Sequence, residues 1–221
     1  NTVKNYGLFL DKFDSQFGEQ DLQSITSDQI LKFLTQTTEG QKQATKRFKY
    51  ILLKTLFNFI KNTIDPSFVN PCDTNLLKKT FRHSKGRQWS ILEKDMVDEC
   101  IFKTDKPRNR LMLELMARGG MRIGEVLKLR AIDVDDCKLF LLNPKSGRPN
   151  EFVFIPKKIA DRLKDYIRSN QIEPQQRIFP LGYTGARQIV KKAGRKVGVE
   201  ISPHDLRRHA ACCQGRRSRG V

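Results

Sequence analysis

Arg122 stands at a point in the sequence where an anion could be held. A glycine pair, Gly119–Gly120, follows an apolar helical segment at 111–116, and a new amphipathic segment begins at Arg122. Glycine adopts positive φ without steric cost, so the pair can reverse the chain. Backbone N–H groups at a helix start have no intrahelical partner and favour an anion. These features predict a phosphate-binding helix start, and a solvated arginine after a helical hairpin is the alternative.

A second group of polar residues with chemical potential follows near the end of the sequence. Ser202–Pro203 suits a helix start because proline fits the first helical turn. His204 and Arg207, three residues apart, then share one helix face. Lys145 lies in the turn-rich stretch 143–150, which predicts a hairpin with a basic tip. An ordinary turn lysine and an ordinary helix-start histidine are the alternatives for Lys145 and His204.

The charge of the chain favours nucleic acid as a partner. The 221 residues include 42 lysines and arginines against 24 acids, a formal charge of +18 and a pI of about 9.9. A membrane surface is the competing anion, but the sequence has no apolar run of spanning length and no signal peptide at its start. The five cysteines match no zinc pattern. We expect a cytoplasmic, nucleoid-associated or other host-cell intracellular protein with reduced thiols and no structural metal.

The first part of the chain, residues 1–71, has the apolar spacing of a helical domain. Thr26 or Ser27 can cap a helix that begins near residue 27. A longer helix follows, and its apolar pattern predicts that it buries Ala44, Phe48, Ile51, Leu52, Thr55, Leu56, Phe59 and Ile60. Its outer face is basic, which favours a DNA-facing surface over an ordinary solvated face. The candidate DNA-binding residues there are Lys42, Lys46, Arg47, Lys49 and Lys54.

The rest of the chain predicts a linker and a second domain. Residues 72–88 are basic and weakly patterned, so we expect an interdomain linker that can follow a phosphate backbone. The second domain, residues 89–221, begins with a predicted capping box of Ser90 and Glu93. Apolar stretches at 132–134 with 138–142, and at 152–155, predict the two strands of a β-hairpin. The fold class is therefore mainly α with a small β-hairpin or sheet.

A helix at 184–197 adds another basic face. We take Arg187 and Lys191 from this face as candidate DNA-binding residues, together with Arg208 beside the pair His204 and Arg207.

The motifs in this order resemble those of the tyrosine site-specific recombinases, the phage integrase family. Residues 120–126, Gly-Met-Arg-Ile-Gly-Glu-Val, match the family's first arginine motif. Lys145 matches its hairpin lysine, and residues 204–207, His-Asp-Leu-Arg, match its His-x-x-Arg box. The resemblance covers nearly the whole chain. It implies a helical, SAM-like core-binding domain followed by a catalytic domain with the DNA breaking-rejoining fold.

The resemblance also implies a reaction and a role for each residue. A tyrosine hydroxyl attacks a DNA phosphate, without metal, ATP or another cofactor. Arg122 and Arg207 would clamp the non-bridging phosphate oxygens, because guanidinium groups offer paired donors. His204 would hydrogen-bond the phosphate or help move the proton of the nucleophile, and Lys145 would protonate the departing 5′ oxygen. Glu125 would orient one of the clamps or the histidine.

One part of the family pattern is missing from this sequence. The family places a further His or Trp, and then the nucleophilic tyrosine, beyond the His-x-x-Arg box, whereas the four tyrosines here are Tyr6, Tyr50, Tyr166 and Tyr183. Residues 210–221 have no apolar periodicity after Ala211, which suggests a truncated or altered recombinase end, and a basic DNA-binding tail is the alternative. We therefore expect a chain that binds double-stranded DNA without cleaving it, so whether it is an enzyme stays open.

Two other interpretations stay open at this stage. The first is a non-catalytic accessory or regulatory protein on the recombinase fold, which occupies sites or pairs with a full-length recombinase. The second is a type IB topoisomerase, which uses a similar arginine, lysine and histidine set and also needs a tyrosine. On DNA we expect a homo-oligomer, a dimer or tetramer, and no membrane partner.

Overall fold

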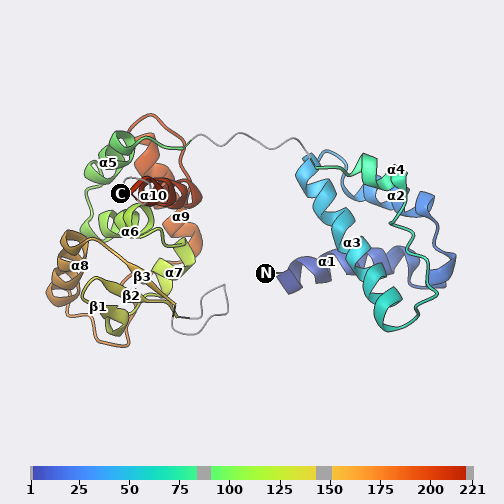
Figure 1. Ribbon diagram of the computed structural model, residues 1–221, viewed down its shortest axis with the longest axis horizontal. Coiled ribbons are helices and arrows are strands. Elements are labelled where there is room, and N and C mark those ends of the chain that lie inside the picture. The colour runs from blue at the N-terminus through green and yellow to red at the C-terminus, as the bar shows by residue number, and fades with distance from the viewer. Residues whose placement is uncertain (1, 84–90, 143–150, 218–221) are drawn as a thin grey trace. The chain divides into compact units, whose positions relative to one another are not determined.

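The computed structural model describes residues 2–83, 91–142 and 151–217. The chain divides into two units, Asn1–Gln88 and Trp89–Val221, each with a hydrophobic core of its own (Figure 1). Helices dominate both units, and the described strands form one three-stranded sheet in the second unit. The prediction of a mainly α fold with a small sheet is confirmed. No helix within the described ranges has both the length and the apolarity that a membrane span requires.

The N-terminal unit is a group of helices around a core of aromatic rings. It contains α1 (Thr2–Phe17), a 3₁₀ turn (Leu22–Ser24), α2 (Ser27–Thr37), α3 (Gln43–Thr63) and α4 (Asn75–Thr80). The ring of Phe13 contacts Phe33 at 5.6 Å and Phe57 at 5.9 Å between centroids, both edge to face. Such pairs add about 1 kcal/mol each beyond burial. Thr26, one of the two predicted caps, caps α2, and it does so through a capping box with Gln29.

The apolar face predicted for α3 is only partly correct. The helix buries Tyr50, Leu52, Leu53, Phe57 and Ile60. Phe48, Ile51 and Phe59 lie on its exposed side instead, and so do Ala44 and Thr55. Helix α3 has apolar residues on two faces, and its spacing alone does not show which face the other helices cover. The packing of α1 decides the question, because its Phe13 packs against Phe57.

The predicted linker at 72–88 is wrong for its first part. Thr74 caps α4, and Leu77 of this helix is buried in the N-terminal core. Phe81 is buried there too and stacks on Tyr50 at 5.4 Å between ring centroids. Tyr50 also donates a hydrogen bond to the backbone oxygen of Cys72 at 3.0 Å. Residues 72–82 therefore belong to the N-terminal unit, and its boundary is not at residue 71.

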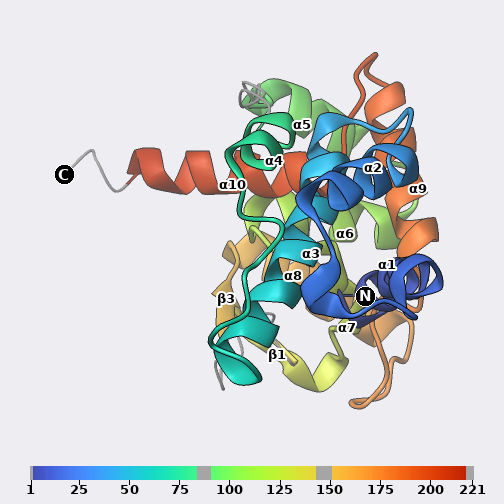
Figure 2. The ribbon, with the colours of Figure 1, turned by 90° about the vertical axis from the view of Figure 1, so that its right-hand side faces the viewer.

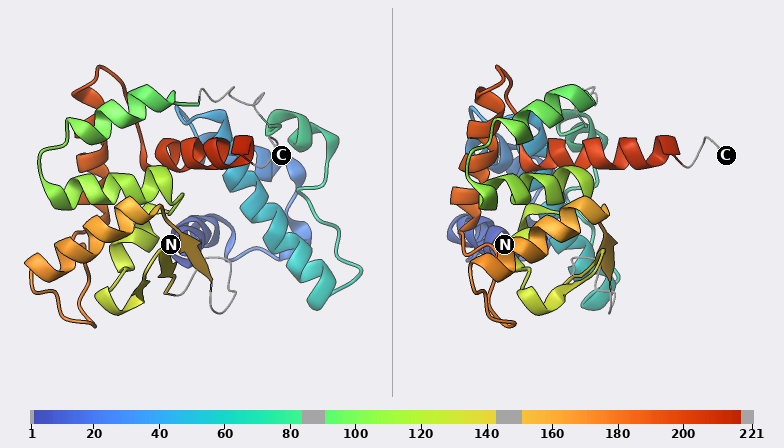
Figure 3. Two further views of the ribbon diagram at one scale, coloured as in Figure 1. Left: turned by 60° about the vertical axis from the view of Figure 1, so that its left-hand side comes forward. Right: turned by 90° about the vertical axis from the view of Figure 1, so that its left-hand side faces the viewer.

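The second unit is built around one almost fully buried helix. It contains α5 (Lys94–Phe102), α6 (Pro107–Arg118), α7 (Ile123–Lys128), a 3₁₀ turn (Ala131–Asp133), β1 (Val134–Asp135), β2 (Lys138–Phe140), β3 (Phe152–Phe154), α8 (Lys157–Ser169), α9 (Tyr183–Arg195) and α10 (Pro203–Arg217). All seven residues of α6 from Leu111 to Ala117 are buried. Helices α5, α8 and α10 pack against α6 (Figure 3, left). The last turns of α10 project beyond the rest of this unit, as two opposite views show (Figure 2 and Figure 3, right).

Two boundaries in the second unit differ from the sequence prediction. Helix α5 begins at Lys94 with Glu93 as its N-cap, and Ser90 lies outside the described residues. The sheet has three antiparallel strands in the order β1-β2-β3, whereas the sequence predicts a two-stranded hairpin. Leu139 pairs with Val134 on one side and Val153 on the other. The stretch at 132–134 contributes only Val134 to the sheet, because residues 131–133 form a 3₁₀ turn.

Candidate functional site

The glycine pair after α6 allows a chain reversal and a close approach in the second unit. Gly120 has φ of +65°, so the chain reverses there and leads into α7. A Cβ atom on Gly119 would lie 3.0 Å from Ile155 Cγ2 and 2.8 Å from the backbone oxygen of Leu115. The missing side chain of Gly119 therefore lets the end of β3 pack against the end of α6. The same two residues position the β2–β3 hairpin and the start of α7.

Glu125 holds Arg122 and Arg207 at one point. Its Oε2 accepts a hydrogen bond from the backbone N–H of Arg122 at 2.7 Å, and its Oε1 accepts one from Arg122 Nη1 at 2.6 Å. Arg207 Nη1, from the second turn of α10, lies 3.6 Å from Glu125 Oε2. The side chain of Glu125 is 9% exposed, whereas those of Arg122 and Arg207 are 40% and 33% exposed. One buried carboxylate thus anchors two half-exposed guanidinium groups.

The geometry corrects the sequence prediction in one respect. The sequence suggests that free N–H groups at the start of α7 hold an anion, but Glu125 already accepts a hydrogen bond from the N–H of Arg122. Two guanidinium groups share one carboxylate, so the three groups together carry one net positive charge. The two half-exposed guanidinium groups present that charge to solvent. A phosphate oxygen could accept hydrogen bonds from both arginines without displacing Glu125.

The two remaining predicted catalytic residues differ in what the structure shows. His204 is exposed in the first turn of α10, one turn before Arg207. Residues three apart on a helix are neighbours, so the imidazole and the Arg207 guanidinium lie on the same side of α10. Lys145 falls at 143–150, outside the described residues. The strands β2 and β3, which bracket it, pair in register from Lys138 with Phe154 to Phe140 with Phe152.

A buried histidine, two residues after Arg207, anchors α10 to its neighbours. His209 is 1% exposed, its Nδ1 lies 2.9 Å from the backbone oxygen of Leu92, and its Nε2 lies 3.3 Å from Arg118 Nη1. Because a carbonyl only accepts and a guanidinium only donates, Nδ1 carries the proton and Nε2 accepts. Arg118 also pairs with Asp98 of α5. This network joins α5, α6 and α10 directly behind the site.

Arg208 has a local partner on its own helix. Its Nη1 lies 3.0 Å from Asp205 Oδ1, and Asp205 also accepts hydrogen bonds from the N–H and hydroxyl of Ser202. Of the two residues that follow Arg207, Arg208 is therefore part of the helix start, and His209 is part of the interior.

Several predicted DNA-binding residues of α3 make contacts within the N-terminal unit. Arg47 donates to the backbone oxygen of Phe81 at 3.3 Å, and Lys54 pairs with Asp73 at 2.8 Å. Lys49 donates to the backbone oxygen of Thr37 at 3.1 Å, and burial lowers its pKa. These three side chains brace the unit. Lys42, just before α3, is exposed, and Lys46 is half-buried.

The basic face of α9 is closer to the prediction. Arg187 is exposed, and Lys191, one helical turn later, is half-buried. Helix α9 packs beside α7, which carries Glu125. The contact of Arg187 and Lys191 with DNA stays a prediction, as does that of Lys42, Lys46 and Arg208.

Sequence reasoning missed the roles of two buried polar side chains, His209 and Glu114. The network of Asp98, Arg118 and His209 joins residues far apart in the chain, so no local pattern indicates it. Glu114, which is 5% exposed, lies in the middle of the apolar run of α6. That interruption is visible in the sequence and could have indicated a buried charge.

Comparison with known proteins gives a family match over the second unit. Residues 92–213 match the model of the phage integrase family. Tyrosine recombinase XerA of Thermococcus kodakarensis is 31% identical over 116 residues, which are 48% of this chain and 41% of that protein. Tyrosine recombinase XerA of Pyrococcus horikoshii is 27% identical over 218 residues, which are 94% of this chain and 71% of that protein.

Two solved structures show the same fold over nearly the whole chain. XerH site-specific recombinase bound to its difH substrate has a TM-score of 0.71 at 19% identity, covering 99% of this chain and 70% of that one. A lambda integrase dimer bound to a COC′ core site has a TM-score of 0.71 at 17% identity, covering 98% of this chain and 80% of that one. At these identities the likeness concerns the fold. With a family match over more than half of its length, the chain belongs to the phage integrase family of tyrosine recombinases.

Proposed function

We propose that this chain is part of a site-specific DNA recombinase or integrase, and that its second unit holds one DNA phosphate between Arg122 and Arg207. The observation that carries this is the convergence of both guanidinium groups on the Glu125 carboxylate, with more positive than negative charge left facing solvent. The formal charge of +18 adds attraction to DNA over the whole chain. The relatives named above are recombinases, and the lambda integrase structure contains DNA.

Each residue has a defined task in the proposed reaction. A tyrosine oxygen bonds to phosphorus as the bond from phosphorus to the 5′ oxygen breaks. Arg122 and Arg207 stabilise the charge on the non-bridging oxygens, for which a positioned donor is worth a few kcal/mol of barrier. His204 donates a hydrogen bond to the phosphate, and Lys145 gives a proton to the departing 5′ oxygen. Glu125 orients the arginines and does not touch the phosphate.

For the polypeptide of residues 1–221 we propose DNA binding without cleavage. The sequence has no tyrosine after His204. Tyr50 is buried in the N-terminal unit with its hydroxyl bonded to the Cys72 carbonyl, and Tyr166 is half-buried in α8. Neither is placed as a nucleophile, and a homo-oligomer of the same polypeptide gains no further tyrosine.

The test combines binding with a covalent trap. Fluorescence anisotropy with a labelled duplex should show binding that weakens steeply with salt, because bound cations release counterions from the phosphates. On a nicked suicide substrate, denaturing electrophoresis should show no protein–DNA adduct. Salt-independent binding would contradict the phosphate contacts, and an adduct would contradict the absence of a nucleophile.

We propose as a second candidate an accessory protein on the recombinase fold, which acts with an intact recombinase. On DNA we propose a dimer or tetramer, either of this chain or together with a full-length partner. Recombination by an intact relative should be stimulated or inhibited when this chain is added. An unchanged rate at saturating amounts of the chain would contradict the accessory role.

A further inference from the structure

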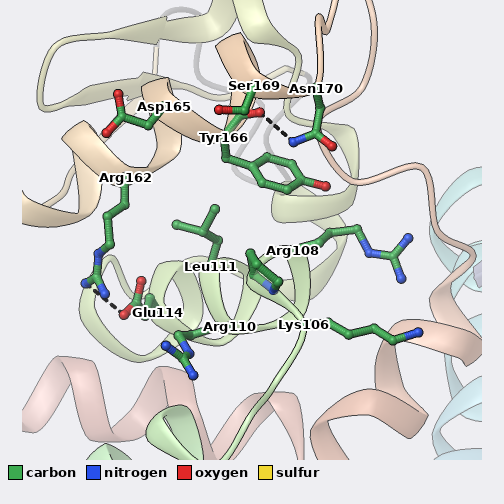
Figure 4. A pocket seen from close by; sticks show the side chains of 11 residues that line it. Lys106, Arg108, Arg110, Leu111, Glu114, Arg162, Asp165, Tyr166, Ser169 and Asn170 are labelled. Carbon is green, nitrogen blue, oxygen red and sulfur yellow. Dashed lines mark hydrogen bonds and ion pairs between the residues drawn. The ribbon is translucent and has the colours of Figure 1, made fainter.

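A cavity lies between α6 and α8, at the end of α6 that is remote from Arg122. Its volume is about 650 Å³, which is within the range of small-molecule sites (Figure 4). The cavity lining on α6 runs from Pro107 to Glu114 and includes neither Arg122 nor Arg207. Leu111 forms part of the floor, and the ring of Tyr166 lies above it. The cavity is therefore separate from the phosphate site.

One wall contains a buried carboxylate with an unused oxygen. Glu114 is 5% exposed, and its Oε1 pairs with Arg162 Nη2 at 2.8 Å. Its Oε2 is buried and has no hydrogen-bond partner among the described residues. Burial raises the pKa of Glu114, and the charge of Arg162 opposes that shift. A buried acceptor without a partner is unfavourable, so a ligand that donates a hydrogen bond to it is stabilised there.

The arginine beside Glu114 controls access to this oxygen. The Arg162 side chain is 43% exposed and reaches Glu114 from α8, across the cavity (Figure 4). The site requires this side chain to rotate, because Oε2 is buried in the present conformation. The pair is already close to neutral, so a neutral N–H or O–H group suits Oε2 better than a second cation.

The opposite end of the cavity is positive. Lys106 precedes the first residue of α6, and Arg108 is in its first turn (Figure 4). Both side chains extend past Tyr166, away from Glu114 (Figure 4). The positive end of the helix dipole adds to this charge, and helix starts bind phosphate for that reason. Arg110, by contrast, is occupied by the backbone oxygens of Phe102 and Thr104.

We propose that this cavity binds a nucleoside phosphate. The phosphate lies at Lys106, Arg108 and the start of α6, and the base or sugar packs on Leu111 and Tyr166. An amino or hydroxyl group of the base or sugar donates to Glu114 Oε2. These three features, a positive end, two apolar side chains in the lining and a buried acceptor, suit this class of ligand better than inorganic phosphate or a nucleoside alone.

Isothermal titration of the full chain with adenosine 5′-monophosphate tests the site. Arg108→Ala and Glu114→Gln should each weaken binding about tenfold, as expected for one charge-assisted hydrogen bond. Lys94→Ala removes a charge from the exposed start of α5, outside the cavity, and should leave binding unchanged. Inorganic phosphate and adenosine should each bind more weakly than the nucleotide. Thermal unfolding of each variant shows that it is folded.

Three results would overturn the proposal. The first is no binding of the nucleotide at millimolar concentration to the folded chain. The second is an equal effect of Lys94→Ala and Arg108→Ala. The third is displacement of the nucleotide by duplex DNA together with an equal loss of duplex affinity in Arg108→Ala, which would make DNA the source of the phosphate. None of these depends on recombinase activity, so the two proposals fail separately.

Discussion

Replacing Glu125 tests the anchor of the arginine pair. Glu125→Gln keeps an acceptor oxygen for the Arg122 N–H but removes the charge that holds both guanidinium groups at 2.6 and 3.6 Å. A hydrogen bond to a charged group contributes about 1.5 to 3 kcal/mol, and the exposure of both arginines places the expected loss near the lower end, about 2 kcal/mol of unfolding free energy. Glu125→Ala also removes the helix cap, which adds about 1 kcal/mol.

Urea unfolding of the full chain, followed by circular dichroism, measures these losses. Glu99→Gln is the matched control, because Glu99 pairs with Lys103 at 2.7 Å in the same unit but is 50% exposed. An exposed pair of this kind contributes about 0.5 kcal/mol. Arg207→Ala should cost less in the Glu125→Gln background than in the original chain. Equal losses for the Glu125 and Glu99 variants, or additive effects of Glu125→Gln and Arg207→Ala, would refute the shared anchor.

Three further changes have defined outcomes. Gly120→Ala should lower the unfolding free energy by about 1 to 2 kcal/mol, because alanine is strained at φ of +65°. Gly124→Ala should be neutral or stabilising, because Gly124 lies in α7 with open space around it. Equal urea midpoints for the two variants would contradict this. His209→Ala should cost about 2 to 3 kcal/mol, because it removes a buried side chain together with its contacts to the Leu92 oxygen and Arg118. The exposed His204→Ala should change stability little, and a stable His209 variant would contradict the network. Hydrogen bonds from two lysine ammonium groups lower the pKa of Asp73 to about 2. Its contribution to the free energy of unfolding is therefore present above about pH 4 and is lost as the pH falls towards 2. Asp73→Asn should remove that part of the pH dependence of unfolding.

The sequence predicts the parts of this fold that local spacing determines. The cap near residue 26, the amphipathic helix after Arg122 and the reversal at the glycine pair each follow from a few adjacent residues. The position of Arg207 relative to Arg122 does not, because it depends on how α10 packs on α6. Only the family resemblance brings the two arginines together in advance.

The errors have one physical origin. Helix α3 has apolar residues on two faces, and the sequence cannot show that Phe57 is covered while Phe59 is not. Basic residues at 72–82 resemble a linker, but Leu77 and Phe81 supply enough apolar surface to fold against α3. In both cases tertiary packing decided between alternatives that local patterns left equal.

The number of phosphates that the arginine pair contacts is the most direct test of the central claim. The logarithm of the duplex affinity falls linearly with the logarithm of salt concentration, with a slope of about −0.9 per neutralised phosphate. If Arg122 and Arg207 hold one phosphate, the double variant Arg122→Ala with Arg207→Ala should reduce the size of that slope by about 1, and Lys94→Ala should leave it unchanged. A reduction of about 2 would place the arginines on separate phosphates, and no reduction would remove DNA from this site.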